Sequence, residues 1–224
     1  MTARSDLVRE AIWGRELSGD EIERASRGLV ERQFSKGSYI CHRGDRLDYW
    51  TGVRQGLLKV SAISRSGKAI TFAGIRSGGW FGEGSVLKDE PRKYDVAALR
   101  DTRLALLNKA TFFWLYENST AFNRFLVRQL NERLAQFMAT LEYDRILDHK
   151  ARVARNLSWF FNPVFYPDVV AHVDITQEEL SRLAGVSRQA VNKSLQELEQ
   201  EGLLHIERER IAVIDVEALM RYEG

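Results

Sequence analysis

The segment from Ile175 to Leu195 constrains the fold most, because it carries start, turn and stop signals for two consecutive short helices. Thr176 followed by Glu179 is a capping box, which marks the first turn of a helix. Gly185 suits the left-handed conformation of a tight turn, and Ser187 is a typical N-cap for a second helix. The expected buried faces consist of Leu180, Leu183 and Ala184, then Val191, Leu195 and Leu198. These signals together predict a helix-turn-helix.

The polar face of the second helix suggests what the motif does. Arginine can bind the O6 and N7 atoms of guanine, and asparagine or glutamine can bind the N6 and N7 atoms of adenine. A recognition helix presents such side chains from its first turns. We therefore expect sequence-specific binding to double-stranded DNA; the alternative is a helical hairpin with a solvated polar face. The expected contacts are Thr176, Ser187, Arg188, Gln189, Asn192 and Lys193.

A β-hairpin is predicted after this motif. Residues 203–206 and 211–214 are apolar except for His205, and residues 207–210 form a charged turn between them. This hairpin would be the wing of a winged helix-turn-helix. Arg208 and Arg210 are candidate phosphate contacts, which position a protein without reading sequence. The alternative is a solvated turn whose charges pair with each other.

The first half of the chain has a different pattern, with strand-length runs separated by glycines from Gln33 to Leu107. Many short strands at regular spacing indicate a sandwich or roll. Ser66-Gly67 is a candidate hairpin turn. A helix is expected over 17–30, with Ser18 and Glu21 as its capping box. The expected strands include 38–41, 57–60, 69–72 and 96–99.

A long helix is predicted from about Ala121 to Tyr143, where glycine and proline are absent. Apolar residues recur there at alternating steps of three and four, which is the a/d pattern of a coiled coil. This seam predicts a homodimer; the alternative is one helix buried in a monomer. The seam consists of Val127, Leu130, Leu134, Phe137 and Leu141, flanked by a second apolar set of Phe122, Phe125, Leu126 and Met138.

A further helix is expected from Arg145 to Phe161, and the two prolines within 162–168 end it. A compact helical pattern should follow up to the hairpin, and Asp215 should cap a last helix over 216–222. The expected fold class is α+β. Its parts are an antiparallel β-roll effector domain (1–118), a dimerisation helix (119–145) and a winged helix-turn-helix domain (146–224).

Composition excludes several classes of protein. No uncharged apolar run is long enough for a membrane span, and the N-terminus lacks an apolar signal core, so we expect a cytoplasmic protein without a membrane partner. The single cysteine, Cys41, rules out an internal disulfide and an all-cysteine iron–sulfur cluster. The net charge of +2 says little about partners, so the DNA prediction rests on local pattern.

An enzyme is the main rival among function classes. A metal site on the β-roll needs clustered ligands, but residues 33–107 contain one histidine, His42. No nucleophile elbow and no GxxxxGK phosphate loop is present. We expect no enzyme activity, no metal and no cofactor. Minor alternatives are a haem or redox role for Cys41 and His42, and a ligand-binding module without DNA activity.

Two segments resemble the Crp/Fnr superfamily of bacterial regulators. One is the start of the second helix, Ser187-Arg188-Gln189-Ala190-Val191; the other is Gly79-Trp80-Phe81-Gly82-Glu83 followed by Pro91-Arg92. The resemblance implies a β-roll, a dimer helix and a winged helix-turn-helix, with RNA polymerase as a further partner. It places Arg188, Gln189 and Lys193 at base-contacting positions, and it matches the second segment to a phosphate-binding cassette. In that cassette the glutamate binds ribose, and the arginine with a following hydroxyl residue binds a cyclic phosphate.

The cassette departs from this pattern after Arg92. Lys93 and Tyr94 stand where nucleotide binders have a hydroxyl residue and alanine. The positions that would meet adenine are the apolar Phe137 and Met138. We therefore expect Glu83 and Arg92 to form a structural ion pair, and the effector to be a small molecule other than cyclic AMP. The alternative is a cyclic-nucleotide-responsive regulator that binds through these two residues. The candidate effector pocket is Gly82, Glu83, Arg92, Lys93, Tyr94, Phe137 and Met138.

Overall fold

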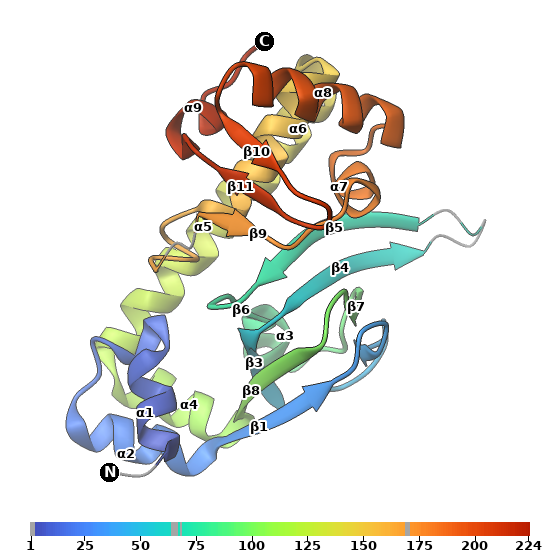
Figure 1. Ribbon diagram of the computed structural model, residues 1–224. Coiled ribbons are helices and arrows are strands. Elements are labelled where there is room, and N and C mark those ends of the chain that lie inside the picture. Colours follow the sequence, from blue (N-terminus) through green and yellow to red (C-terminus); the bar gives the residue numbers. More distant parts are fainter. Residues whose placement is uncertain (1–2, 64–66, 68, 169–170) are drawn as a thin grey trace. The chain divides into compact units, whose positions relative to one another are not determined.

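The computed structural model describes residues 3–63, 67, 69–168 and 171–224 (Figure 1). The chain divides into two compact units, one of residues 1–60 and 75–131, the other of residues 61–74 and 132–224. Each unit is described below by itself. Ser66 of the expected hairpin turn lies outside the described residues.

The first unit contains several short helices, most of them before or after its strands. The capping box of the second helix is confirmed, because Ser18 Oγ accepts from Glu21 N and Ser18 N donates to Glu21 Oε2 at 2.7 Å. This cap explains why the helix begins at Gly19. The helical elements are α1 (Ala3–Glu10), η1 (Ile12–Gly14), α2 (Gly19–Gly28), α3 (Glu83–Lys88) and α4 (Lys109–Asn118).

Two four-stranded sheets form the β-roll, as expected. One has the order β1-β8-β3-β6, with antiparallel neighbours, and the other has the order β2-β7-β4-β5. Residues 61–74 of the β4–β5 hairpin group with the second unit. The strands are β1 (Leu29–Phe34), β2 (Tyr39–Cys41), β3 (Tyr49–Gln55), β4 (Leu57–Ile63), β5 (Ala69–Arg76), β6 (Trp80–Phe81), β7 (Asp95–Ala98) and β8 (Thr102–Asn108).

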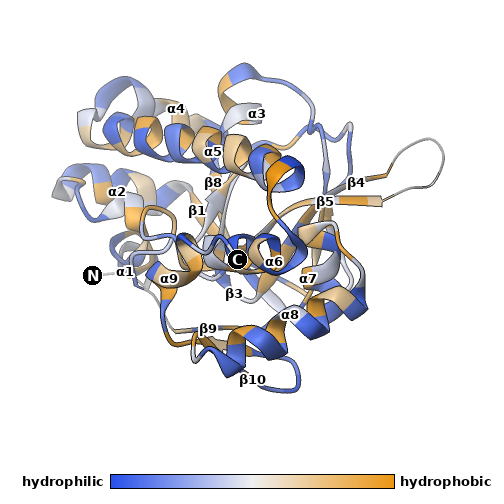
Figure 2. Cartoon of the chain, turned by 90° about the horizontal axis from the view of Figure 1, so that it is seen from above, coloured by the Kyte–Doolittle hydropathy of each residue, from blue (hydrophilic) through white to orange (hydrophobic). Residues whose placement is uncertain are grey.

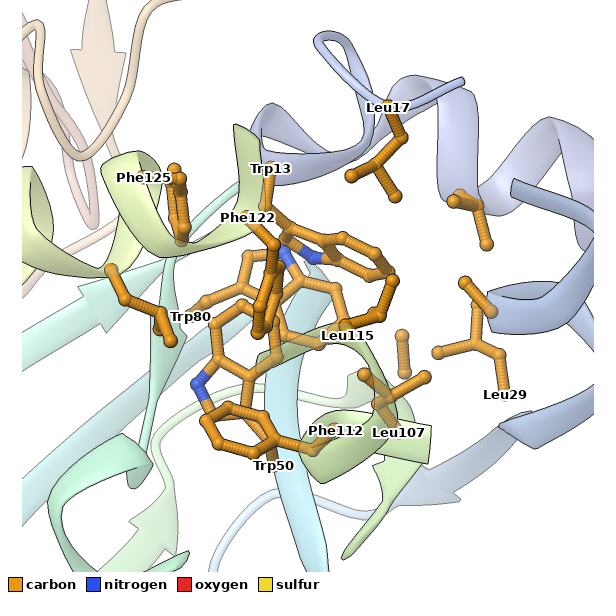
Figure 3. Packing of buried hydrophobic residues seen from close by; sticks show 14 of the residues in the cluster. Trp13, Leu17, Leu29, Trp50, Trp80, Leu107, Phe112, Leu115, Phe122 and Phe125 are labelled. Carbon is orange, nitrogen blue, oxygen red and sulfur yellow. The ribbon is translucent and has the colours of Figure 1, made fainter. Parts of the chain in front are cut away.

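An aromatic cluster fills the core of the first unit (Figure 3). The Trp50 and Trp80 rings lie 4.4 Å apart between centroids, and Trp13 meets Trp80 edge-on at 5.2 Å. Phe122 packs edge-on against Trp50 at 5.6 Å. Aromatic pairs in these geometries stabilise a core beyond the area that they bury. Because Phe122 belongs to the long helix, the cluster fixes the start of that helix to the β-roll.

The long helix, α5 (Thr120–Ile146), has one apolar face that is buried and one that is exposed. Phe122, Phe125 and Leu126 are buried in the first unit. Figure 2 shows hydrophobic and hydrophilic residues alternating along the helix. The exposed apolar residues are Val127 (67%), Leu130 (39%), Leu134 (56%), Phe137 (60%), Met138 (62%) and Leu141 (44%). Met138, which belongs to the flanking set in the sequence, is exposed in the same way as the seam residues.

The second unit contains a helix break that differs from expectation. The helix predicted from Arg145 is interrupted, because α5 ends at Ile146 and α6 (His149–Ser158) begins three residues later. Asp148 causes the new start, since its Oδ1 accepts from Ala151 N at 2.8 Å and caps α6. A 3₁₀ turn, η2 (Trp159–Phe161), completes this segment.

The remaining elements form a helical core with a small sheet. They are β9 (His172–Val173), α7 (Gln177–Ala184), α8 (Arg188–Gln200), β10 (Leu204–Ile206), β11 (Ile211–Val213) and α9 (Val216–Met220). Strand β9 was not predicted; it joins β11 through the pairs Ile211–Val173 and Ala212–His172. Helix α9 is capped by Asp215 as expected, but ends two residues before Tyr222. In the described part of the chain, no helix combines the length and apolarity of a membrane span.

Candidate nucleic-acid interface

Helix α7 and the turn after it have the geometry that the sequence predicts. Thr176 N donates to Glu179 Oε2 at 2.8 Å, and Thr176 Oγ1 accepts from Glu179 N at 3.2 Å. Gly185 ends the helix with φ 67°, a conformation that favours glycine. Its N–H donates to the carbonyl of Ser181, a buried small residue. The turn between the helices is therefore tight and closed by hydrogen bonds.

Helix α8 is likewise fixed at its start and along its inner face. Ser187 Oγ accepts from Ala190 N at 3.1 Å, so the predicted N-cap is confirmed. Val191, Leu195 and Leu198 are fully buried. A capped, well-packed helix holds the backbone of its outer residues in a fixed position, which direct recognition of DNA bases requires.

Four of the expected DNA contacts lie within α8, and three of these side chains are exposed. Arg188, Gln189 and Lys193 lie on the outer face of the first turns of α8. Lys193 Nζ is 3.8 Å from Glu197 Oε1, a weak pair because the lysine side chain is 81% exposed. Such a pair leaves the lysine available to a phosphate or a base.

The fourth residue, Asn192, differs from the expectation that it faces outward freely. It is half-buried, and its Nδ2 donates to Gln177 Oε1 at 3.1 Å. Gln177 is the first residue of α7, fifteen positions earlier in the chain. The spacing of residues within one helix carries no information about a contact between two helices. The sequence therefore did not identify Gln177 as part of the interface.

The predicted wing is present as the hairpin of β10 and β11. Arg208 is exposed at its tip, and within the described residues it makes no ion pair. Arg210 Nε instead lies 2.7 Å from Asp174 Oδ1. The hydrogen bond to Asp174 raises the pKa of Arg210, and it ties the wing to the segment before α7. Arg208 is thus the better candidate for a phosphate contact.

The end of α5 contacts the helix that follows it. Arg152 Nη2 donates to the Asp144 carbonyl at 3.0 Å, and Arg152 Nη1 is 3.6 Å from Asp144 Oδ1. Farther along, Lys150 Nζ is 2.9 Å from Glu201 Oε1, and the Tyr222 hydroxyl donates to Glu201 Oε2 at 2.7 Å. These contacts join α6 to α5, to the end of α8 and to the C-terminal residues.

The cassette in the first unit places a guanidinium in an unusual environment. Arg92 is only 2% exposed, and its Nη2 donates to the Tyr49 carbonyl at 3.4 Å. Within the described part of the chain, its Nε and Nη1 have no hydrogen-bond partner. At Gly82 a Cβ atom would lie 2.0 Å from Arg92 Nη1, so only glycine allows this approach. A buried cation with two unused donors is costly without an anion or water beside it.

The structure places both charged residues of this cassette in the interior. Glu83 and Arg92 are each 2% exposed, and within the described residues Glu83 Oε2 has no hydrogen-bond partner, so the ion pair between the two side chains stays a prediction. Lys93 does not fill space beside Arg92, because its side chain is 71% exposed and pairs with Glu90 Oε2 at 2.9 Å. Tyr94 is half-buried.

Cys41 and His42 have ordinary structural environments. Cys41 is 2% exposed, and burial raises the pKa of its thiol. His42 stacks on Tyr39 at 4.2 Å, and its Nδ1 is 3.6 Å from Asp95 Oδ1. Across the described ranges, no group of three or more histidine, cysteine or acidic side chains is arranged to hold a metal ion.

Comparison with known proteins gives consistent matches to both halves of the chain. The family model of the cyclic nucleotide-binding domain matches residues 31–119, and that of the Crp-like helix-turn-helix domain matches residues 132–222. The cAMP-activated global transcriptional regulator Vfr of Pseudomonas aeruginosa is 26% identical over 191 residues, covering 81% of this chain and 88% of its own.

A second relative and a solved structure are also similar to this chain. The cyclic AMP receptor protein of Thermus thermophilus is 26% identical over 196 residues, covering 85% of this chain and 86% of its own. The structure of FixK2 from Bradyrhizobium japonicum has a similar fold, with a TM-score of 0.71 at 15% identity, over 88% of this chain and 98% of that one. The two family models in this order and the similarity to these two regulators show that the chain belongs to the Crp/Fnr family of DNA-binding transcription regulators.

Proposed function

We propose that the protein is a homodimeric, sequence-specific regulator that binds a near-palindromic operator. The observation that carries this proposal is the outer face of α8, where Arg188, Gln189 and Lys193 are exposed on a helix capped by Ser187. These side chains provide the donors and acceptors that distinguish base pairs in the major groove. Arg208 on the wing would contact phosphate.

The dimer part of the proposal rests on α5. Five of its exposed apolar side chains, from Val127 to Leu141, follow a coiled-coil spacing, and exposed apolar surface of this kind favours a partner. A second copy of the same helix is the simplest partner, because in a twofold dimer the exposed apolar face of each α5 covers that of the other. Two recognition helices in such a dimer would enter major grooves about 34 Å apart.

Selection of bound sequences from random double-stranded DNA tests the proposal. We expect enrichment of two inverted half-sites whose centres are about 10 base pairs apart, or a multiple of that spacing. Enrichment of a single unpaired half-site would contradict the dimeric mode of binding.

The effector is proposed to be an anionic small molecule that binds at Arg92 in the β-roll. A buried guanidinium with two unused N–H groups supports an anionic ligand, since charged hydrogen bonds would offset its desolvation. The division 1–118, 119–145 and 146–224 would then separate effector binding, dimerisation and DNA binding. Binding would change the hinge at 144–148, where Arg152 contacts Asp144. This regulator would act in the cytoplasm together with RNA polymerase.

Cyclic AMP is expected not to be this effector, although Vfr is named as cAMP-activated. At position 93 a lysine directed toward Glu90 replaces the compact hydroxyl donor. Phe137 and Met138 offer no hydrogen bond to adenine. Each missing buried hydrogen bond costs about 1–3 kcal/mol, so two of them would move binding out of the micromolar range.

Isothermal titration with cyclic AMP checks this expectation, and the wild type should show no saturable micromolar binding. The rival function is a cyclic-nucleotide-responsive regulator, which the unpaired donors of Arg92 favour. Micromolar binding that tightens operator affinity and disappears in Arg92→Met would establish that rival and reject our interpretation of the pocket.

A further inference from the structure

One side chain on the reading face of α8 is held from outside that helix. Arg188, Gln189 and Lys193 are exposed, whereas Asn192 is half-buried and donates to Gln177 Oε1 at 3.1 Å. Gln177 is half-buried as well. The contact therefore joins the first turn of α7 to the second turn of the recognition helix.

Both ends of this contact start from fixed backbone. The capping box of Thr176 and Glu179 fixes the residue before and the residues after Gln177. Ser187 caps α8 one turn before Asn192. Because the terminal torsion of an asparagine side chain is otherwise broad, a single hydrogen bond between fixed helices defines the plane of its amide.

The chemistry left on Asn192 suits one kind of base. An asparagine amide has one acceptor oxygen and two N–H donors. The bond to Gln177 uses one N–H and leaves the oxygen and the second N–H. Adenine is read by such a pair, with the oxygen accepting from N6 and the N–H donating to N7.

We propose that Gln177 is a positioning residue for base reading, which orients the Asn192 amide toward an adenine in the operator. The inference rests on the proposed function, in which α8 lies in the major groove. Gln177 itself need not touch the base. Its effect is on specificity at one position of each half-site, and its removal should have little influence elsewhere in the site.

The test measures binding of variants to the selected operator and to operators with each single base replaced. Asn192→Ala should reduce discrimination at one adenine by about 5- to 150-fold. Gln177→Ala should reduce discrimination at that same position by about two- to tenfold, the value of one hydrogen bond. The double variant should lose no more discrimination than Asn192→Ala alone, since the two residues act as one unit.

A conservative variant separates positioning from structural support. Gln177→Glu keeps an acceptor for Asn192, so it should retain the adenine preference, while its charge weakens binding to all sequences through repulsion by phosphates. Gln200→Ala, an exposed amide at the far end of α8, is the matched control and should change neither affinity nor preference.

Two results would overturn the inference in distinguishable ways. If the wild type selects a sequence but Gln177→Ala weakens all sites equally, Gln177 is only structural and this inference alone fails. If the wild type enriches no sequence from random DNA, the proposed function fails, and the inference fails with it.

Discussion

Leu134→Glu should convert the protein from a dimer into a monomer and abolish tight operator binding. Leu134 lies in the middle of the seam on α5, and its side chain is 56% exposed in the single chain. In a paired seam a glutamate there would be buried against its own symmetry mate. Two desolvated like charges cost several kcal/mol, more than the packing of one leucine contributes.

The loss of operator affinity should be large because dimeric binding is multivalent. In a dimer, binding of one recognition helix holds the other close to the second half-site. A monomer loses this advantage, so its affinity for the operator should fall about 100- to 10,000-fold. Light scattering at micromolar concentration and a mobility shift on the selected operator measure the two effects. Ala135→Glu adds the same charge at a neighbouring exposed position outside the seam, and it should remain dimeric. A monomeric wild type would contradict the dimer.

Arg188→Ala and Arg208→Ala should weaken DNA binding in different ways. If Arg188 binds a guanine through O6 and N7, its loss should cost about 1–3 kcal/mol on the selected site and relax preference at one base pair. Arg208 would contact phosphate, so its loss should weaken all sequences about equally. It should also lower the slope of log K against log salt by about 0.9, the contribution of one phosphate contact.

Titrations of the selected site and of random DNA over a range of salt concentrations distinguish these roles. Arg221→Ala serves as the control for lost charge, because Arg221 is exposed near the C-terminus, outside both α8 and the wing. The Arg221→Ala variant should have the same ratio of affinities for selected and random DNA as the wild type. Equal losses on selected and random DNA from Arg188→Ala would reject base reading by that residue.

Local signals in the sequence predicted the elements that hold the interface. Ser18, Thr176, Ser187 and Asp215 each cap a helix through a bond to a residue three positions later. Cap, turn and seam patterns depend on near neighbours in the chain, so they can be recognised without a structure. The order of a β domain, a long helix and a winged helix-turn-helix followed from such signals, and the resemblance to the Crp/Fnr superfamily made the β domain a roll.

Contacts between distant segments could not be predicted in the same way. The bond from Asn192 to Gln177, the pair of Arg210 with Asp174 and the two-residue strand β9 all join residues from different elements. Arg92 is a further example. Its residue type predicted a charged partner, but only the fold reveals a buried guanidinium with two unused donors.

The ratio of the wild type's affinities for its selected operator and for random DNA, measured at one physiological salt concentration, tests the central claim most directly. A base-reading helix that exposes Arg188, Gln189 and Lys193 predicts a ratio of about 1,000 or more, as specific regulators achieve. A ratio near one, with both affinities falling equally as salt rises, would mean that the protein contacts only phosphates, and it would contradict sequence-specific recognition.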